Sequence, residues 1–354
     1  MAEVTRRKLL AGGVAAMLPG CLPRSGERDG GQGGLEPAFR PQPNAEYDAW
    51  LAAFRGRARA QGITTATLDR GFRGQGFLPG VVERDRNQTE FRRTTEDYLA
   101  LVASEEDIAA GRPRVAAQRA MLAAIEADSG VDADVIAAIW GLETRFGTRL
   151  GRIPVISATS TLAWEGRRGR FFEAQLLAAL RILQAGDTTT DRMVGSWAGA
   201  MGHTQLMPTV YRDYAVDFQG DGRRGIWGRD PTDALASAAE YLRRHGWRRG
   251  QRWGMEVLLP AGFDTGATGR DIRRPVSAWQ AAGVRPAQGG SLPDHGTAAI
   301  HAPAGAAGPA WILYHNFNVI LRYNPSVNYG IGVGYIADRL AGGGPLARRF
   351  GPDE

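Results

Sequence analysis

One acidic residue stands in the most apolar helical stretch of the chain, where it suits either catalysis or structure. The stretch 132–147 reads DADVIAAIWGLETRFG. On helical spacing, Glu143 shares a face with four apolar residues, Ile136, Ile139, Trp140 and Phe146. Such a face packs against a core, and burial raises the pKa of a carboxyl toward the range of a general acid. A carboxylate at the edge of the core, reaching solvent or paired with an arginine, fits the same spacing.

A second polar segment, 195–211, reads GSWAGAMGHTQLMPTVY. Its small residues let a ligand approach the backbone, while Ser196, His203 and Gln205 offer neutral groups that suit sugar hydroxyls and acetamido groups. The segment is not a serine nucleophile elbow, because its order is Gly-Ser-Trp-Ala-Gly and no strand pattern precedes it. A tight glycine loop that only packs helices together explains this segment equally well.

A third segment, 217–233, spaces oxygen-bearing side chains as the first ligands of an EF-hand are spaced: Asp217, Gln219 and Asp221. Gly228 stands at the twelfth position, where a bidentate Glu would close such a loop. A longer loop closed by Asp230 or Asp233 could hold a hard cation such as calcium, and without one the segment is a polar turn. We expect a weak site rather than a strong one.

A fourth segment, 316–329, reads NFNVILRYNPSVNY and joins two expected helices. Pro325 prevents one continuous helix, so Tyr323, Asn324 and Tyr329 gather at the break. Aromatic rings and an amide at such a junction resemble a carbohydrate platform, and a buried structural cluster is the alternative.

Helical patterns dominate the chain from residue 47 onward. They cover 46–60, 114–127, 132–145, 171–184, 233–245 and 326–340. The stretch 254–312 differs, because its glycines, prolines and short apolar runs predict short strands and loops. The expected fold class is therefore mainly α, of the α+β kind. It consists of a helical domain over 45–345 with a small β-containing insertion and an EF-hand-like loop, followed by a tail over 346–354.

The composition argues against nucleic acid as a partner. The 354 residues carry a formal charge of +6, from 43 basic and 37 acidic residues, and Lys8 is the only lysine. The arginine pairs are scattered, and no block of like charge forms a nucleic-acid-binding arm. So modest a charge points only weakly to an anionic partner such as a cell wall.

The N-terminus predicts export. Basic residues precede an apolar run over 9–18 that is too short to span a bilayer, so residues 1–21 are expected to be an export signal. The adjacent Arg6 and Arg7 resemble a twin-arginine signal. Cys21, the only cysteine, ends a sequence that resembles a lipoprotein cleavage box and is the expected lipid attachment point, although ordinary signal-peptidase cleavage stays open. A flexible tether is expected over 22–44.

Taken together, the four segments resemble the B-type lytic murein transglycosylases and their lysozyme-like domain. The matching stretches are 140–147, 195–205, 214–222 and 316–324, in the order of the family. The resemblance implies that Glu143 is the catalytic acid and base. It implies sugar contacts at Ser196, Gln205, Tyr323, Asn324 and Tyr329, a basic pair in the cleft at Arg167 and Arg168, and further aromatics at Tyr241 and Tyr98.

The resemblance also implies a calcium loop formed by Asp217, Gln219, Asp221 and the closing Asp233. The chain departs from the family at Leu206, where an aromatic usually follows Gln205, and over 227–233, which is longer. The calcium would be structural, because the implied chemistry needs no cofactor.

The implied activity is cleavage of the MurNAc-β-1,4-GlcNAc bond of peptidoglycan glycan strands without water, which gives 1,6-anhydromuramyl products. The implied protein is exported, periplasmic and monomeric, and is held at the outer membrane where Cys21 carries lipid. Two alternatives stay open. One is a lysozyme-type muramidase, a hydrolase with a second acid folded into place, and the other is a non-catalytic scaffold lipoprotein that binds peptidoglycan.

Overall fold

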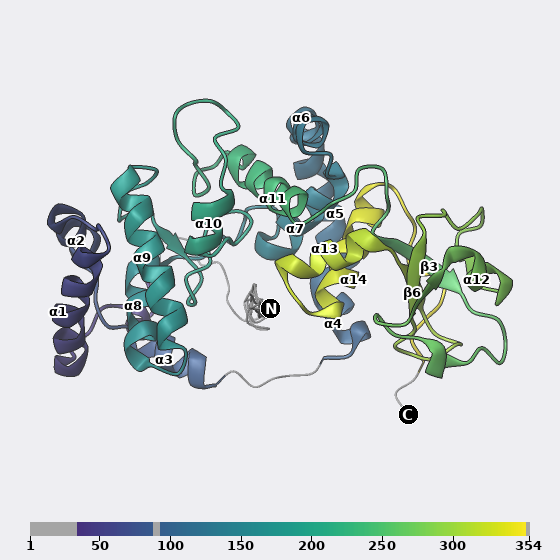
Figure 1. Ribbon diagram of the computed structural model, residues 1–354, viewed down its shortest axis with the longest axis horizontal. Coiled ribbons are helices and arrows are strands. Elements are labelled where there is room, and N and C mark those ends of the chain that lie inside the picture. Colours follow the sequence, from purple (N-terminus) through teal and green to yellow (C-terminus); the bar gives the residue numbers. More distant parts are fainter. Residues whose placement is uncertain (1–33, 88–92, 352–354) are drawn as a thin grey trace, which may run out of the picture.

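A computed structural model describes residues 34–87 and 93–351 (Figure 1). The expected export signal and Cys21 lie outside the described residues. Within the described ranges, no helix has both the length and the apolar character needed to cross a membrane.

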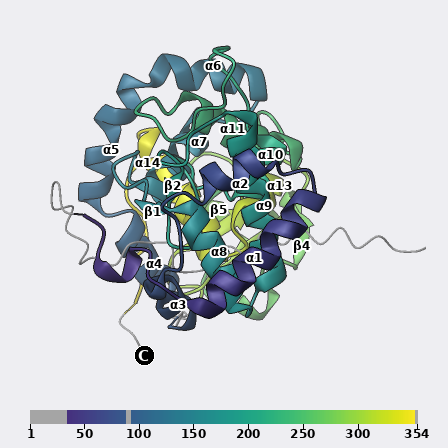
Figure 2. The same ribbon diagram turned by 90° about the vertical axis from the view of Figure 1, so that its left-hand side faces the viewer.

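The helices form two groups that lie side by side along the longest axis (Figure 1). The first group packs around the α8–α9 pair, and Figure 2 turns it toward the viewer. It contains α1 (Ala45–Ala60), α2 (Thr65–Gly71), α3 (Pro79–Arg86), α8 (Val155–Glu165) and α9 (Gly169–Ala185).

The second group packs around the contact between the central helices α7 (Ala133–Thr144) and α14 (Val327–Leu340). Its other members are α4 (Thr95–Val102), α5 (Glu105–Ala117), α6 (Arg119–Ser129), α11 (Thr232–Arg244) and α13 (His315–Tyr323). Helix α10 (Pro208–Tyr214) contacts both α9 and α11, so it links the two groups. The chain therefore brings two segments nearly 200 residues apart into one central packing layer.

A five-stranded antiparallel sheet lies at the opposite end from α1 (Figure 1). Its order is β4-β6-β7-β3-β5, from β3 (Gly254–Leu258), β4 (Arg273–Pro275), β5 (Arg285–Pro286), β6 (Thr297–His301) and β7 (Ala310–Leu313). Side chains on one face of the sheet pack with Trp279 of α12 (Val276–Ala281) in a separate hydrophobic core. Trp311 and Leu313, on the other face, belong to the main core. The mainly helical fold with a β-containing insertion is confirmed.

The helix ends follow local signals, with one difference from the expected helix limits. Gly130, Gly166 and Gly186 adopt left-handed conformations directly after α6, α8 and α9, where only glycine turns without strain. The helix expected over 114–127 is divided, because α5 ends at Ala117 and α6 begins at Arg119. Asp132 stands at the N-cap of α7, but its side chain makes no capping hydrogen bond.

The described parts of the expected tether and tail both contact the domain. The 3-10 helix η1 (Pro37–Phe39) buries Phe39 in a cluster with residues of α3 and α8, and Gln42 bridges to Phe77, so the described end of the 22–44 segment is packed. At the other end, Glu256 accepts the backbone amides of Ala347 and Arg348. Residues 346–351 therefore lie against the domain, because their polar backbone has a partner there.

Gly334 offers a test of how closely α14 approaches the rest of the core. A Cβ at this helical position would overlap the indole ring of the buried Trp253. We expect Gly334→Ala to lower the free energy of unfolding by about 1–3 kcal/mol, because the core is overpacked there. Gly56→Ala, at an exposed site of α1 with open space around it, is expected to raise it by about 0.5–1 kcal/mol. Denaturant titration of both variants checks the pair, and a Gly334→Ala protein as stable as the wild type would contradict it.

Candidate active site

Helix α7 carries Glu143 in its last turn and ends one residue later. Ile136, Ile139 and Trp140 are buried on its inner face, as the spacing predicts. Phe146 is buried for another reason, because Arg145, Phe146 and Gly147 all adopt positive φ angles of 48°, 55° and 81° and turn the chain out of the helix. The turn folds the Phe146 ring against Trp140, with centroids 5.7 Å apart and planes at 80°. Phe146 therefore joins the apolar side chains of α7 through a backbone turn, and not through helical periodicity.

His203 of the glycine-rich loop holds the end of α7. The indole Nε1 of Trp140 donates to His203 Nδ1 at 3.1 Å, and Thr144 Oγ1 donates to the His203 carbonyl at 2.8 Å. Burial lowers the pKa of His203, so its ring is neutral and its Nε2 donates to the Gly228 carbonyl at 2.8 Å. His203 is thus a structural connection and not a sugar-binding group.

The same loop is shaped by close backbone contacts. Strands β1 (Ile153–Pro154) and β2 (Val194–Gly195) pair at its entrance, and a Cβ on Gly195 would overlap the Ala200 carbonyl. Ser196 Oγ accepts the Ala200 amide at 3.1 Å. Gln205 adopts a left-handed φ of 49°, and its Nε2 donates to the Gly202 carbonyl at 2.9 Å. The strained backbone at Gln205 is therefore held by its own side chain.

Three tyrosines surround the Glu143 carboxyl. Tyr329 donates its hydroxyl to Glu143 Oε1 at 2.7 Å, and its ring lies parallel to that of Tyr323 at 6.4 Å. Tyr323 donates to the Thr204 carbonyl, beside Gln205. Burial, followed by the charge of Glu143, raises the pKa of Tyr98, Tyr323 and Tyr329, so all three stay protonated.

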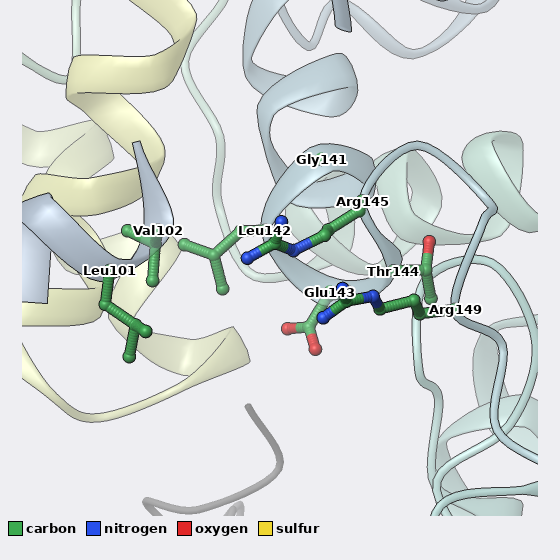
Figure 3. Close-up of a pocket in the computed structure, with 8 residues that line it drawn as sticks. All are labelled: Leu101, Val102, Gly141, Leu142, Glu143, Thr144, Arg145 and Arg149. Carbon is green, nitrogen blue, oxygen red and sulfur yellow. The ribbon is translucent and has the colours of Figure 1, made fainter. Parts of the chain in front are cut away.

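Burial raises the pKa of Glu143 itself to about 7, and the hydrogen bond from Tyr329 lowers it in part. The carboxyl opens on a small pocket (Figure 3). Leu101 and Val102 of α4 line one side, and the side chains of Arg145 and Arg149 lie on the other. Glu143 is the one carboxyl group among the residues that line this pocket in the described structure. The arrangement suits a group that gives and takes a proton near neutral pH.

The other expected sugar-contacting residues divide between those near this centre and those away from it. Tyr241 lies edge-on to Tyr323 at 5.3 Å, and its hydroxyl donates to the Arg322 carbonyl at 2.6 Å. Asn324 ends α13, and its Oδ1 accepts the Ser326 amide at 3.0 Å. Tyr241 therefore extends the tyrosine cluster, and Asn324 caps the helix that ends at Tyr323.

Arg167 and Arg168 are not among the residues that line the pocket of Glu143. Both guanidinium groups pair with the buried carboxylate of Asp85, at 2.7 and 3.2 Å, and so join the α8–α9 turn to α3. The pair therefore has a structural partner that the sequence patterns do not reveal.

The acidic loop gathers the hard oxygen donors that calcium prefers. Carboxylate oxygens of Asp217, Asp221 and Asp233 lie within 4.8 Å of one another. Asp217 and Asp233 also accept backbone amides from the loop, which shapes it around these carboxylates. Gln219 donates its side-chain amide to Asp230 Oδ2 at 2.8 Å. The three carboxylates fit a hard cation in their chemistry.

Comparison with known proteins identifies the class. The fold resembles solved lytic transglycosylases of the lysozyme-like kind, among them SltB3 from Pseudomonas aeruginosa in complex with NAG-anhNAM-pentapeptide. That match has a TM-score of 0.83 and 46% identity over 88% of this chain and 84% of SltB3. The Escherichia coli lytic transglycosylase Slt35 in complex with calcium matches with a TM-score of 0.70 and 26% identity, over 87% of this chain and 98% of Slt35.

The family follows from the sequence match. The Transglycosylase SLT domain family matches residues 46–338, and the chain belongs to this family. The membrane-bound lytic murein transglycosylase B of Escherichia coli (strain K12) is 36% identical over 221 residues. That alignment covers 60% of this chain and 58% of the relative's length. The resemblance seen in the four sequence segments is confirmed.

Three residues that line the pocket could not be found from the sequence. Arg149 lines the pocket only six residues after Glu143, but the sequence offers no reason to separate it from the many other arginines. Leu101 and Val102 come from α4, whose partners are on α14 and cannot be inferred from local spacing.

The raised pKa of Glu143 predicts how stability depends on pH. An unfolded Glu loses its proton near pH 4.5, whereas folded Glu143 keeps it up to about pH 7, so the folded state binds the extra proton between these values. Stability contributed by this group is complete below pH 4.5 and falls as pH rises to about 7. We expect Glu143→Gln to be about 2–3 kcal/mol more stable than the wild type at pH 8 and nearly equal at pH 4. Denaturant titration across this range checks the difference, and a difference that does not change with pH would contradict the cause.

Proposed function

We propose that this protein is a peptidoglycan lytic transglycosylase that cleaves the MurNAc-β-1,4-GlcNAc bond and releases 1,6-anhydromuramyl products. The observation that carries the proposal is a single carboxyl, Glu143, with a pKa near 7 in a pocket whose other described lining residues include no second acid. A hydrolytic glycosidase normally uses two carboxylates that flank the scissile bond. A single carboxyl suits a reaction in which the sugar supplies its own nucleophile.

Glu143 acts twice in the proposed reaction. Because Tyr329 donates to Oε1, the proton of the neutral acid belongs on Oε2. Oε2 gives this proton to the glycosidic oxygen as its bond to the muramyl C1 breaks, and GlcNAc leaves with a free hydroxyl. The carboxylate then takes the proton of the muramyl C6 hydroxyl while the C6 oxygen bonds to C1. The ring closes, and Glu143 is protonated again.

Neutral groups around Glu143 would bind the sugars. We assign sugar contacts to Ser196, Gln205, Tyr323 and Asn324, which lie on the glycine-rich loop and the helix break that the hydrogen bond from Tyr323 to the Thr204 carbonyl joins. The SltB3 structure contains NAG-anhNAM-pentapeptide, a fragment of the same chemistry as the proposed product. The residue after Gln205 is Leu206, which is aliphatic and fully buried, so the loop offers no aromatic ring at this position. Sugar binding there would depend on hydrogen bonds and not on stacking.

Export and membrane attachment form part of the proposal. The basic and apolar signal over 1–21 supports transport to the periplasm, and Cys21 is the proposed lipid attachment point. One relative carries the description membrane-bound, which supports an anchor at the outer membrane. An anchored enzyme would act on strands close to that membrane.

A structural calcium ion is also proposed for the acidic loop. Asp217, Asp221 and Asp233 would hold it, and the Slt35 structure in complex with calcium supports this assignment. The ion would neutralise three neighbouring carboxylates and stiffen the loop that precedes α11. It has no role in the chemical steps.

Product analysis tests the proposed reaction. Purified sacculi treated with the wild-type protein are expected to release 1,6-anhydromuropeptides, identified by mass spectrometry. Glu143→Gln is expected to lower the rate by at least about 10³-fold, because the amide cannot donate or accept the proton. Its thermal unfolding serves as the control for folding. Products with reducing muramic ends would support a hydrolase, and an unchanged effect of Glu143→Gln on sacculi would support a scaffold.

Calcium titration tests the proposed ion. Millimolar CaCl₂ is expected to raise the Tm of the wild type by a few degrees, because an ion that binds only the folded state stabilises it. Asp221→Asn is expected to lose this shift, because it removes one of the three carboxylates. The substitution should disturb the loop little, since the exposed Asp221 carboxylate accepts only the Arg223 amide there. MgCl₂ at equal ionic strength is the control for charge screening. An equal shift in Asp221→Asn and wild type would contradict the assignment.

A further inference from the structure

Two arginines line the pocket of Glu143, and they differ in whether an acidic side chain pairs with them. Arg145 is held by Asp107, with its guanidinium nitrogen 2.7 Å from the carboxylate. Arg149 lies along the same pocket, with its guanidinium group extended toward Glu143 (Figure 3). Across residues 34–87 and 93–351, no side chain or carbonyl forms a hydrogen bond or ion pair with that guanidinium group. One of the two cations is therefore available to a ligand.

Contacts fix the backbone turn that carries Arg149, whereas its guanidinium group has no hydrogen-bond or ion-pair partner in the described structure. The Arg149 amide donates to the Thr144 carbonyl at 2.9 Å, and Gly147 is the last residue of the left-handed turn at the end of α7. Gly151 packs directly on the backbone of Gly195, where a Cβ would overlap. Because its backbone is fixed, the long side chain of Arg149 carries the guanidinium group only within reach of this turn, and it lines the pocket of Glu143.

The charge of Arg149 determines which ligand suits it. The guanidinium group of Arg149 is a cation, and no described side chain balances its charge. Sugar hydroxyls are neutral and would leave the cation unbalanced. A carboxylate would neutralise it, and its two oxygens match the two parallel N–H donors of a guanidinium group.

We propose that Arg149 binds a carboxylate of the peptide stem carried by the muramyl sugar, and that it makes the enzyme prefer strands with intact stems. The inference rests on the proposed function, since it places the stem of that substrate in the pocket of Glu143. Every peptide stem ends in a carboxylate, so the ligand is part of the substrate and needs no further component. Arg149 is a specificity residue and takes no part in the proton transfers.

Two substrates test the inference. Glycan strands with their stems, and the same strands stripped of stems by an amidase, are compared by release of anhydro sugars. For Arg149→Gln we expect kcat/KM to fall about tenfold on stem-bearing strands, as for loss of one charge-assisted hydrogen bond, and to stay within about twofold on stripped strands. Arg149→Lys keeps the charge and is expected to recover part of the loss. Arg170→Gln, an exposed arginine on α9, is the matched control and is expected to change neither value.

Each other outcome overturns the inference. Equal losses on both substrates would assign Arg149 to the fold or to the sugars, including the lactyl carboxylate that the amidase leaves on each muramyl sugar. No loss on either substrate would remove Arg149 from binding. Calorimetry of a stem-bearing muropeptide with Glu143→Gln and with Glu143→Gln/Arg149→Gln gives a readout without turnover, and equal affinities would also overturn it. A wild type that releases no anhydro product refutes the proposed function, while this binding comparison still decides the role of Arg149.

Discussion

The site depends on the connection between the end of α7 and the glycine-rich loop. Trp140 and Thr144 both bond to His203, one to its ring and one to its carbonyl. The loop residues that follow His203 reach Tyr323, through the Thr204 carbonyl, and include Gln205. One neutral histidine thereby links the Glu143 carboxyl, the proposed acid and base, to the groups proposed to bind sugar. Because its two ring nitrogens are both used, protonation of His203 would cost the bond from Trp140.

Much of this arrangement could be predicted where the signal is local. The helical face of Ile136, Ile139 and Trp140 and the strands within 254–312 follow from periodicity and from glycine and proline positions. The order of four motifs identified the family, and the role proposed for Glu143 follows from that resemblance. Local patterns suffice here because an amphipathic helix must bury one face whatever packs against it.

Partners distant in the chain could not be predicted. Asp85 pairs with Arg167 across 82 residues, and Trp140 bonds to His203 across 63. Periodicity placed Phe146 on the helical face for the wrong reason, since α7 ends at Thr144 and Phe146 is the second of the three left-handed residues that follow. The backbone at Arg145 and Phe146 has no glycine to announce such a turn. Its conformation is imposed by tertiary contacts, among them the packing of Phe146 on Trp140.

A single carboxyl can serve as acid and then as base only if nothing nearby competes for its proton. The pocket meets this condition because the groups nearest to Glu143 do not titrate at neutral pH. The pKa values of Tyr98, Tyr323 and Tyr329 are raised by burial, so these hydroxyls remain donors throughout. A second carboxylate at close range would instead share the proton and divide the titration into two steps. The proposed chemistry therefore requires that no second acid lines the pocket, and the described lining has none. The same burial makes the folded protein less stable once Glu143 is ionised.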